Sequence, residues 1–146
     1  MKGGTAADVA TLALMRKYDF AVMINGYKFL LEFTPAGMSA PHVPWYFPYY
    51  GHYYGSMGMH LLGQEYKDDK DFRINTARYI AETQQQLLAW REKGGGWPNK
   101  GWIKDQEKGE TNAYATAFAT MTLFVPEGRL SIYSRIPPKL PHPPKE

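Results

Sequence analysis

The fold of this 146-residue chain is decided by two stretches that share one pattern, WYFPYYGHYYGSMGMHLLG (45–63) and NAYATAFATMTLFV (112–125). In each stretch two aromatic residues, a methionine and an aliphatic residue follow one another at i, i+4, i+7 and i+11. They are Tyr50, Tyr54, Met57 and Leu61 in the first stretch, and Tyr114, Phe118, Met121 and Val125 in the second. This spacing predicts one face of an α-helix. Because neither stretch carries Asp, Glu, Lys or Arg, we expect both helices to be buried on every side.

Three more helices are predicted around these two. Thr5 caps an alanine-rich helix to Arg16, and a second helix covers residues 20–33. A third predicted partner, residues 70–92, is amphipathic, with one apolar face formed by Phe72, Thr76, Tyr79, Thr83, Leu87 and Trp90. The first quoted helix begins at Tyr46 or Tyr49 and ends before Gly63, a favourable residue after a helix C-terminus. The second begins at a cap, Thr111 or Asn112, and ends near Val125.

The pattern contains almost no strand signal, so the predicted fold class is all-α. Buried helices alternate with half-exposed ones, which is typical of stacked helical hairpins. We expect one domain over residues 1–135. The proline-rich tail, residues 136–146, is expected to be extended or disordered.

Composition excludes several classes of function. The net charge is only +3 and basic residues interleave with acidic ones, which argues against a nucleic-acid partner. No apolar run is long enough to span a bilayer, and the first ten residues lack the apolar core of a signal peptide, so the cytoplasm is the default expectation. With no cysteine, the chain has neither disulfides nor thiolate metal sites.

Three segments together resemble the C-terminal part of the terpenoid cyclase and protein prenyltransferase superfamily, the α/α toroids built from prenyltransferase and squalene oxidase repeats. Residues 45–63 resemble the start of an inner helix. LLAWREKGGGW (87–97) resembles the helix and Gly-x-Trp turn of a QW repeat, and NAYATAFATMTLFVPEGRLSIY (112–133) resembles a last inner helix with a closing hook. The resemblance implies that the helical hairpins form part of an α/α toroid.

The sequence also departs from this family. A QW repeat carries a glutamine shortly before Gly-x-Trp, whereas residues 89–92 contain none, so Trp97 lacks its usual stacking partner. The zinc site of the protein prenyltransferases needs a cysteine, which this chain does not have. The squalene-type cyclases use an Asp-x-Asp-Asp motif as their acid, but Asp68, Asp69 and Asp71 are spaced Asp-Asp-x-Asp.

Structural roles explain most of the remaining polar residues. The three aspartates precede a predicted helix, where carboxylates cap free amides and favour the helix dipole. His52 and His60 are eight residues apart, about 80° from a shared face of a helix. The sequence therefore predicts no metal and no cofactor.

The aromatic stretch is the candidate site. Core packing is one interpretation of it. In the other, Trp45, Tyr49, Tyr50, His52 and Tyr53 line one mouth of a toroid cavity. Walls of aromatic rings suit apolar or cationic ligands, because ring faces are negative.

The preferred hypothesis is a repeat module that is non-catalytic by itself and has an aromatic-lined apolar surface for a ligand or partner. Its expected partners are an apolar small molecule or the missing toroid repeats of a larger chain. One alternative is the C-terminal segment of a cyclase-like or prenyltransferase-like enzyme whose acid lies outside this chain. Another is an interaction scaffold, since a partial toroid exposes faces that favour self-association.

Overall fold

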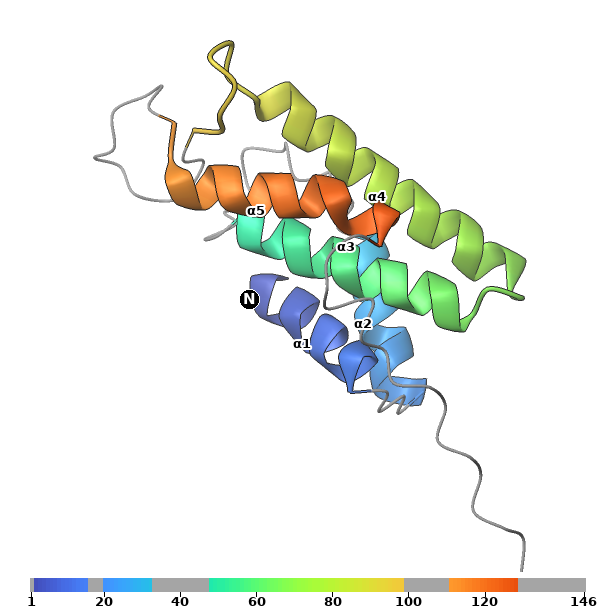
Figure 1. Ribbon diagram of the computed structural model, residues 1–146. Coiled ribbons are helices and arrows are strands. Elements are labelled where there is room, and N and C mark those ends of the chain that lie inside the picture. Colours follow the sequence, from blue (N-terminus) through green and yellow to red (C-terminus); the bar gives the residue numbers. More distant parts are fainter. Residues whose placement is uncertain (1, 16–19, 33–47, 99–110, 129–146) are drawn as a thin grey trace, which may run out of the picture.

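The computed structural model describes residues 2–15, 20–32, 48–98 and 111–128 (Figure 1). The described part contains α1 (Lys2–Leu14), α2 (Phe20–Glu32), α3 (Pro48–Glu65), α4 (Lys70–Trp90) and α5 (Ala113–Phe124), followed by the short 3-10 helix η2 (Val125–Glu127). Its one extended pairing is an isolated bridge between Pro98 and Thr111. The predicted all-α class is confirmed. None of the described helices combines the length and hydrophobicity needed to cross a membrane.

The helices form two successive hairpins, α1–α2 and α3–α4, and α5 follows them. Figure 1 shows α1, α3 and α5 running side by side in one direction, with α3 in the middle. α3 contacts both α1 and α5, while α2 packs on α1 and α4 packs on α3. This is the predicted alternation of inner and outer helices. The closed ring of a toroid stays a prediction.

Glycines on α3 allow its neighbours to approach closely. A Cβ added at Gly55 would collide with the Tyr79 hydroxyl of α4, and one at Gly63 would lie 2.7 Å from the Thr76 Oγ1 of the same helix. On another side, a Cβ at Gly58 would lie 3.0 Å from the Val9 Cγ1 of α1. Small residues thus set the distances between the helices, as the sequence indicated.

Two helix starts match the predicted caps. The Asp69 Oδ1 accepts hydrogen bonds from the backbone amides of Asp71 and Phe72, at 2.9 and 3.1 Å, at the start of α4. The Asn112 Oδ1 accepts a hydrogen bond from the Ala115 amide at the start of α5. The capping explanation of the aspartate cluster is therefore confirmed for Asp69.

Two predicted boundaries were wrong. α1 begins at Lys2 and not after a Thr5 cap, and it ends at Leu14. α3 continues through Gly63 to Glu65. The reason is tertiary in both cases: α1 packs along α3, and Gly63 lies against Thr76, so contacts with neighbouring helices outweigh a weak local stop signal.

The two patterned helices differ in burial. The prediction that both are buried on every side holds for most of α3, where Tyr50, Tyr54 and His60 are half-buried. The buried residues of α3 are Pro48, Tyr49, Gly51, His52, Tyr53, Gly55, Ser56, Met57, Gly58, Met59, Leu61 and Leu62. The prediction is wrong for α5, where the buried residues are Ala115, Ala119 and Thr122. α5 packs on α3 and only slightly on α4, so much of its surface has no neighbour among the described residues.

Candidate functional site

The described residues of the predicted aromatic wall contact two different neighbours of α3. Trp45 lies outside the described residues. Tyr49 and His52 face the end of α4, with ring centroids 5.6 and 5.3 Å from that of Trp90. Tyr50 and Tyr53 face α5, at 6.1 and 5.6 Å from the Phe118 ring. One pair therefore packs toward α4 and the other toward α5.

Tyr49 helps to hold the turn after α4. Its hydroxyl donates a 2.6 Å hydrogen bond to the Pro98 carbonyl, and its side chain is almost completely buried. Burial raises the pKa of the Tyr49 phenol, so it stays protonated and keeps this donor. The structural contact gives Tyr49 a packing role.

Trp97 connects three elements at the same turn. Its Nε1 donates to the Leu87 carbonyl at 2.7 Å, and its backbone amide donates to the Thr116 Oγ1 of α5 at 3.1 Å. The guanidinium carbon of Arg91 lies 5.7 Å from the centre of the indole ring, and the Arg91 Nε donates to the Gly95 carbonyl. Gly95 has a φ of 102°, a conformation that suits glycine.

Arg91 therefore lies within residues 89–92, the segment in which a QW repeat would carry a glutamine and this chain has none. A guanidinium can stack on an aromatic face and donate hydrogen bonds at the same time. The sequence reasoning missed this residue because it looked only for glutamine. Arg91 was within the window that it searched.

His52 is fully buried, and burial lowers its pKa to about 4. The imidazole is consequently neutral at pH 7 and cannot supply a cation to a ligand. Together with Tyr49, it belongs to the helix-packing core. The ligand-binding role of the predicted set as a whole stays a prediction.

The aromatic rings of α3 that face α5 contact rings of α5. We name Tyr50, Tyr53, Tyr54, Tyr114 and Phe118 the aromatic face. Tyr54 lies 4.5 Å from Tyr50 and 5.0 Å from Tyr53 between centroids, and Phe118 lies 4.8 Å from Tyr114. These distances suit tilted and edge-on ring contacts, each of which contributes about 1 kcal/mol beyond simple burial.

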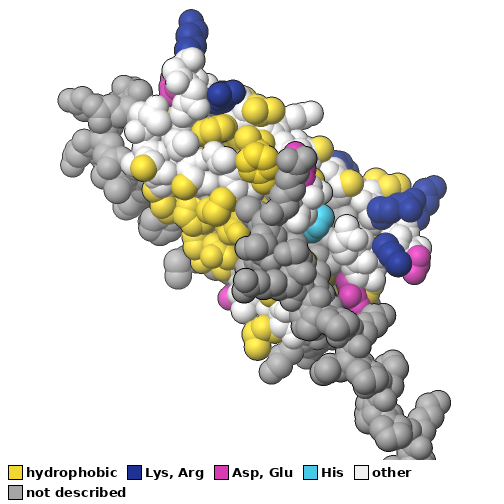
Figure 2. All heavy atoms as spheres, viewed as in Figure 1, with side chains coloured by type: hydrophobic (Ala, Val, Ile, Leu, Met, Phe, Trp, Pro, Cys, Tyr) yellow, Lys and Arg dark blue, Asp and Glu magenta, His cyan; other side chains and the backbone are white. Residues whose placement is uncertain are grey.

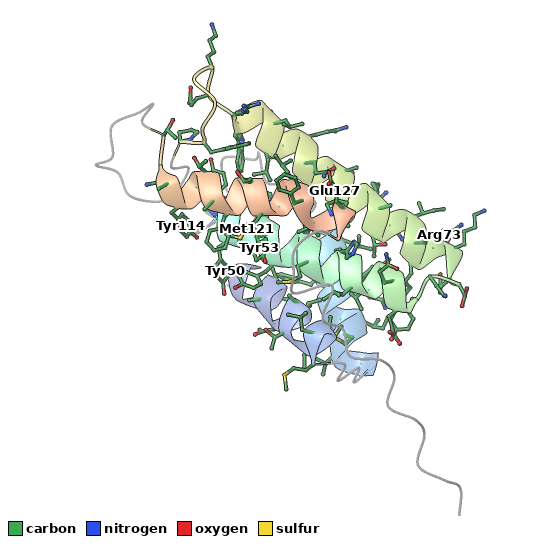
Figure 3. The ribbon with its side chains drawn as sticks, viewed as in Figure 1. Tyr50, Tyr53, Arg73, Tyr114, Met121 and Glu127 are labelled. Carbon is green, nitrogen blue, oxygen red and sulfur yellow. The ribbon has the colours of Figure 1, made fainter. Side chains whose placement is uncertain are left out.

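The aromatic face is partly open to solvent. Tyr114 is 41% exposed, whereas Tyr53 beneath it is 8% exposed. Figure 3 shows Tyr114, Tyr50 and Tyr53 close together, with Met121 beside them. In Figure 2 hydrophobic side chains gather on this side, over the N-terminal halves of α5 and its neighbours. The rings thus form a surface with a buried base.

Gly55 marks the side of α3 that meets Tyr79 of α4. At 3.6 residues per turn, Tyr50 projects about 140° around the helix from Gly55 and Tyr54 about 100°. The rings that contact Tyr50 and Tyr54 belong to α3 and α5, whereas Tyr49 contacts Trp90 of α4. The aromatic face is thus formed between α3 and α5.

The face can offer dispersion contacts and negative ring surfaces, but little acid–base chemistry. Burial raises the pKa values of Tyr53 and Tyr114, so both phenols are protonated at pH 7. Within the described ranges, no group of three His, Asp or Glu side chains could hold a metal ion. What this arrangement can do is bind an apolar or cationic group.

Tyr54, Tyr114 and Phe118 were absent from the predicted site. The sequence did contain a signal, because the repeated offsets give both helices aromatic residues at equivalent positions, Tyr50 and Tyr54 in one and Tyr114 and Phe118 in the other. The prediction took its residues from one continuous stretch, whereas the rings that meet across the helices are set by packing. No protein-family model, curated protein or solved structure matches this chain, so its function is inferred from these residues themselves.

Proposed function

We propose that the chain is a helical-hairpin binding module that holds an apolar ligand on its aromatic face and is non-catalytic by itself. In this proposal it belongs to the prenyltransferase and squalene oxidase repeat superfamily that its sequence resembles. Further repeats would complete the wall of the binding site.

The observation that carries the proposal is the five-ring surface shared by α3 and α5. Tyr50 and Tyr53 of α3 lie 6.1 and 5.6 Å from Phe118 of α5 between ring centroids, and the outer ring, Tyr114, is 41% exposed. Such clusters normally close over their own rings or receive something apolar. An open cluster above a buried base favours a receiving role.

Two of the described acidic residues have structural partners. Asp69 caps α4, and Glu82 pairs with Arg78 on the same helix at 3.9 Å. A cyclase-type acid needs a carboxyl group beside the apolar site, and these two carboxylates are already engaged elsewhere.

The test uses farnesol, an uncharged apolar alcohol, and follows tyrosine fluorescence on titration. We expect saturable binding that weakens about fivefold in Tyr114→Ser, which removes one ring contact. Phe124→Ser is the matched control, because Phe124 is also on α5 and also 41% exposed but lies outside the aromatic face. The Phe124→Ser variant should bind farnesol with the same affinity as the unchanged protein.

Three results would contradict the proposal. Equal affinities for all three proteins would remove the aromatic face from the binding event. Turnover of squalene or of a prenyl diphosphate by the purified protein would make it an enzyme, and self-association abolished by Tyr114→Ser without farnesol binding would make it a scaffold.

A further inference from the structure

A hollow of about 350 Å³ lies at the opposite end of α3 from the aromatic face. It is lined by the last turns of α3, by residues of α4 from Arg73 to Gln84 and by Pro126 of η2. Figure 3 shows Arg73, one of its lining residues, at the far end of the molecule from Tyr114. Its volume falls within the range of small-molecule sites and equals that of about a dozen waters.

Two small residues of α4 leave room for this hollow. α4 presents Ala77 and Ala81 one turn apart, while Gly63 of α3, which also lines the hollow, lies against Thr76 of α4. Both alanines are exposed, whereas Met59 and Ile80 beside them are buried. The hollow therefore has an apolar base that is open to solvent.

The polar side chains at the hollow give it a positive charge. Its described lining includes Arg73, His60, Gln64 and Gln84 but neither Asp nor Glu. Burial lowers the pKa of His60, so at pH 7 that ring adds hydrogen-bonding groups and Arg73 adds the charge. No ion pair joins Arg73 to another described residue, whereas Arg78 on the same helix pairs with Glu82.

Two hydrogen bonds hold side chains that line the hollow. The Gln84 Nε2 donates a 3.2 Å hydrogen bond to the Leu123 carbonyl, which ties α4 to α5. The Thr76 hydroxyl donates to the Phe72 carbonyl at 2.8 Å. The hollow is thus bounded by side chains that are already held in place, as ligand sites usually are.

We propose that this hollow is a second site, for a small amphiphilic carboxylate. Its aliphatic body lies on Met59, Ile80 and the two alanines, and its carboxylate is held by the Arg73 guanidinium. A planar guanidinium can donate two parallel hydrogen bonds to a carboxylate. This site is independent of the aromatic face and of the function proposed for it.

The test titrates the protein with octanoate and follows backbone amide resonances by two-dimensional NMR. We expect saturable shifts centred on Gly63, Ala77 and Ala81, and binding of octanol that is about fivefold weaker, since octanol lacks the charged partner of Arg73. Octylammonium, which carries the opposite charge, should bind more weakly still. Arg73→Gln should weaken octanoate binding about fivefold, the scale of one exposed charge contact. Arg78→Gln, which changes the net charge equally but lies outside the hollow, should leave the affinity unchanged.

A second variant tests the volume of the site. Ala81→Trp places a large side chain in the hollow from an exposed helix position, so the fold is retained and octanoate binding should be lost. Absence of octanoate shifts at Gly63 in the unchanged protein overturns the proposal. Equal binding of octanoate and octanol, or equal effects of Arg73→Gln and Arg78→Gln, overturns the assignment of the carboxylate to Arg73.

Discussion

α3 and α5 carry the same pattern of large and small residues, yet they have different surroundings. Met57 of α3 is 1% exposed, whereas Met121, at the equivalent position of α5, is only partly buried. Ser56 of α3 is completely buried, whereas its counterpart Thr120 is exposed. The difference teaches that the pattern specifies a helix and its ring contacts, while the number of neighbouring helices specifies its burial.

Truncation of the two equivalent methionines should give the largest contrast. Met57→Ala leaves a cavity in a closed core and should lower the free energy of unfolding by about 3 kcal/mol. Met121→Ala is expected to cost about 1 kcal/mol, because solvent and neighbouring side chains can fill the space. Urea denaturation followed by circular dichroism measures both. Equal losses would mean that α5 is as enclosed as α3.

Acid should destabilise α3 through His52, whose counterpart in α5 is Thr116. The pKa of His52 is about 4 in the folded protein, below the usual 6.5, so the unfolded chain takes up this proton first as the pH falls. The stabilisation is fully present above pH 6.5 and is lost between pH 6.5 and 4, up to about 3 kcal/mol. Urea denaturation at several pH values measures it.

Variants of His52 and of His60 separate the contributions of these two histidines to the pH dependence of stability. His52→Gln should flatten the dependence of stability on pH over that interval. His60 is also shifted downward by burial, so His60→Gln should remove a smaller share of it. If His52→Gln leaves the pH dependence unchanged, the histidine is not enclosed in the way that the structure describes.

The smallest effect is expected at the turn that joins α4 to α5. Trp97→Phe removes the donor to the Leu87 carbonyl and should cost about 1–2 kcal/mol, because that buried acceptor loses its partner. Trp97 also contacts Thr116 of α5, so amide hydrogen exchange should accelerate in α5 more than in α3. Trp90→Phe is the control. If the two variants destabilise the protein equally, the hydrogen bond of Trp97 makes no measurable contribution of its own to the free energy of unfolding.

The sequence predicted individual helices better than it predicted their ends. The apolar face of the fourth helix was identified correctly: Thr76, Tyr79, Thr83 and Leu87 are all buried. Gly63 was misjudged as a stop signal, since its role is to let α3 lie against Thr76. Glycine is favoured at both positions because it has no side chain. The sequence alone therefore does not distinguish a glycine that follows a helix from a glycine at a contact between two helices.

The ligand-binding role of the predicted site residues stays a prediction. Of those that the structure describes, Tyr50 and Tyr53 contact Phe118 of α5, whereas Tyr49 and His52 contact Trp90 of α4. Adjacent residues on a helix project about 100° apart, so a run of aromatic residues must divide among several faces. Tyr114 and Phe118 come from a helix sixty residues later and join the site only through packing.

By itself, the sequence determined the all-α class, the alternation of apolar and amphipathic helices, and the caps to within an aspartate cluster at α4 and a choice of Thr111 or Asn112 at α5. These depend on local periodicity and on side chains that reach nearby amides. Only the tertiary structure decided that α3 is enclosed and α5 half open, that Arg91 stacks on Trp97, and that small residues leave a hollow beside Arg73. These features depend on which elements lie side by side. That arrangement is set by the combined packing of all the helices and cannot be read from any single segment.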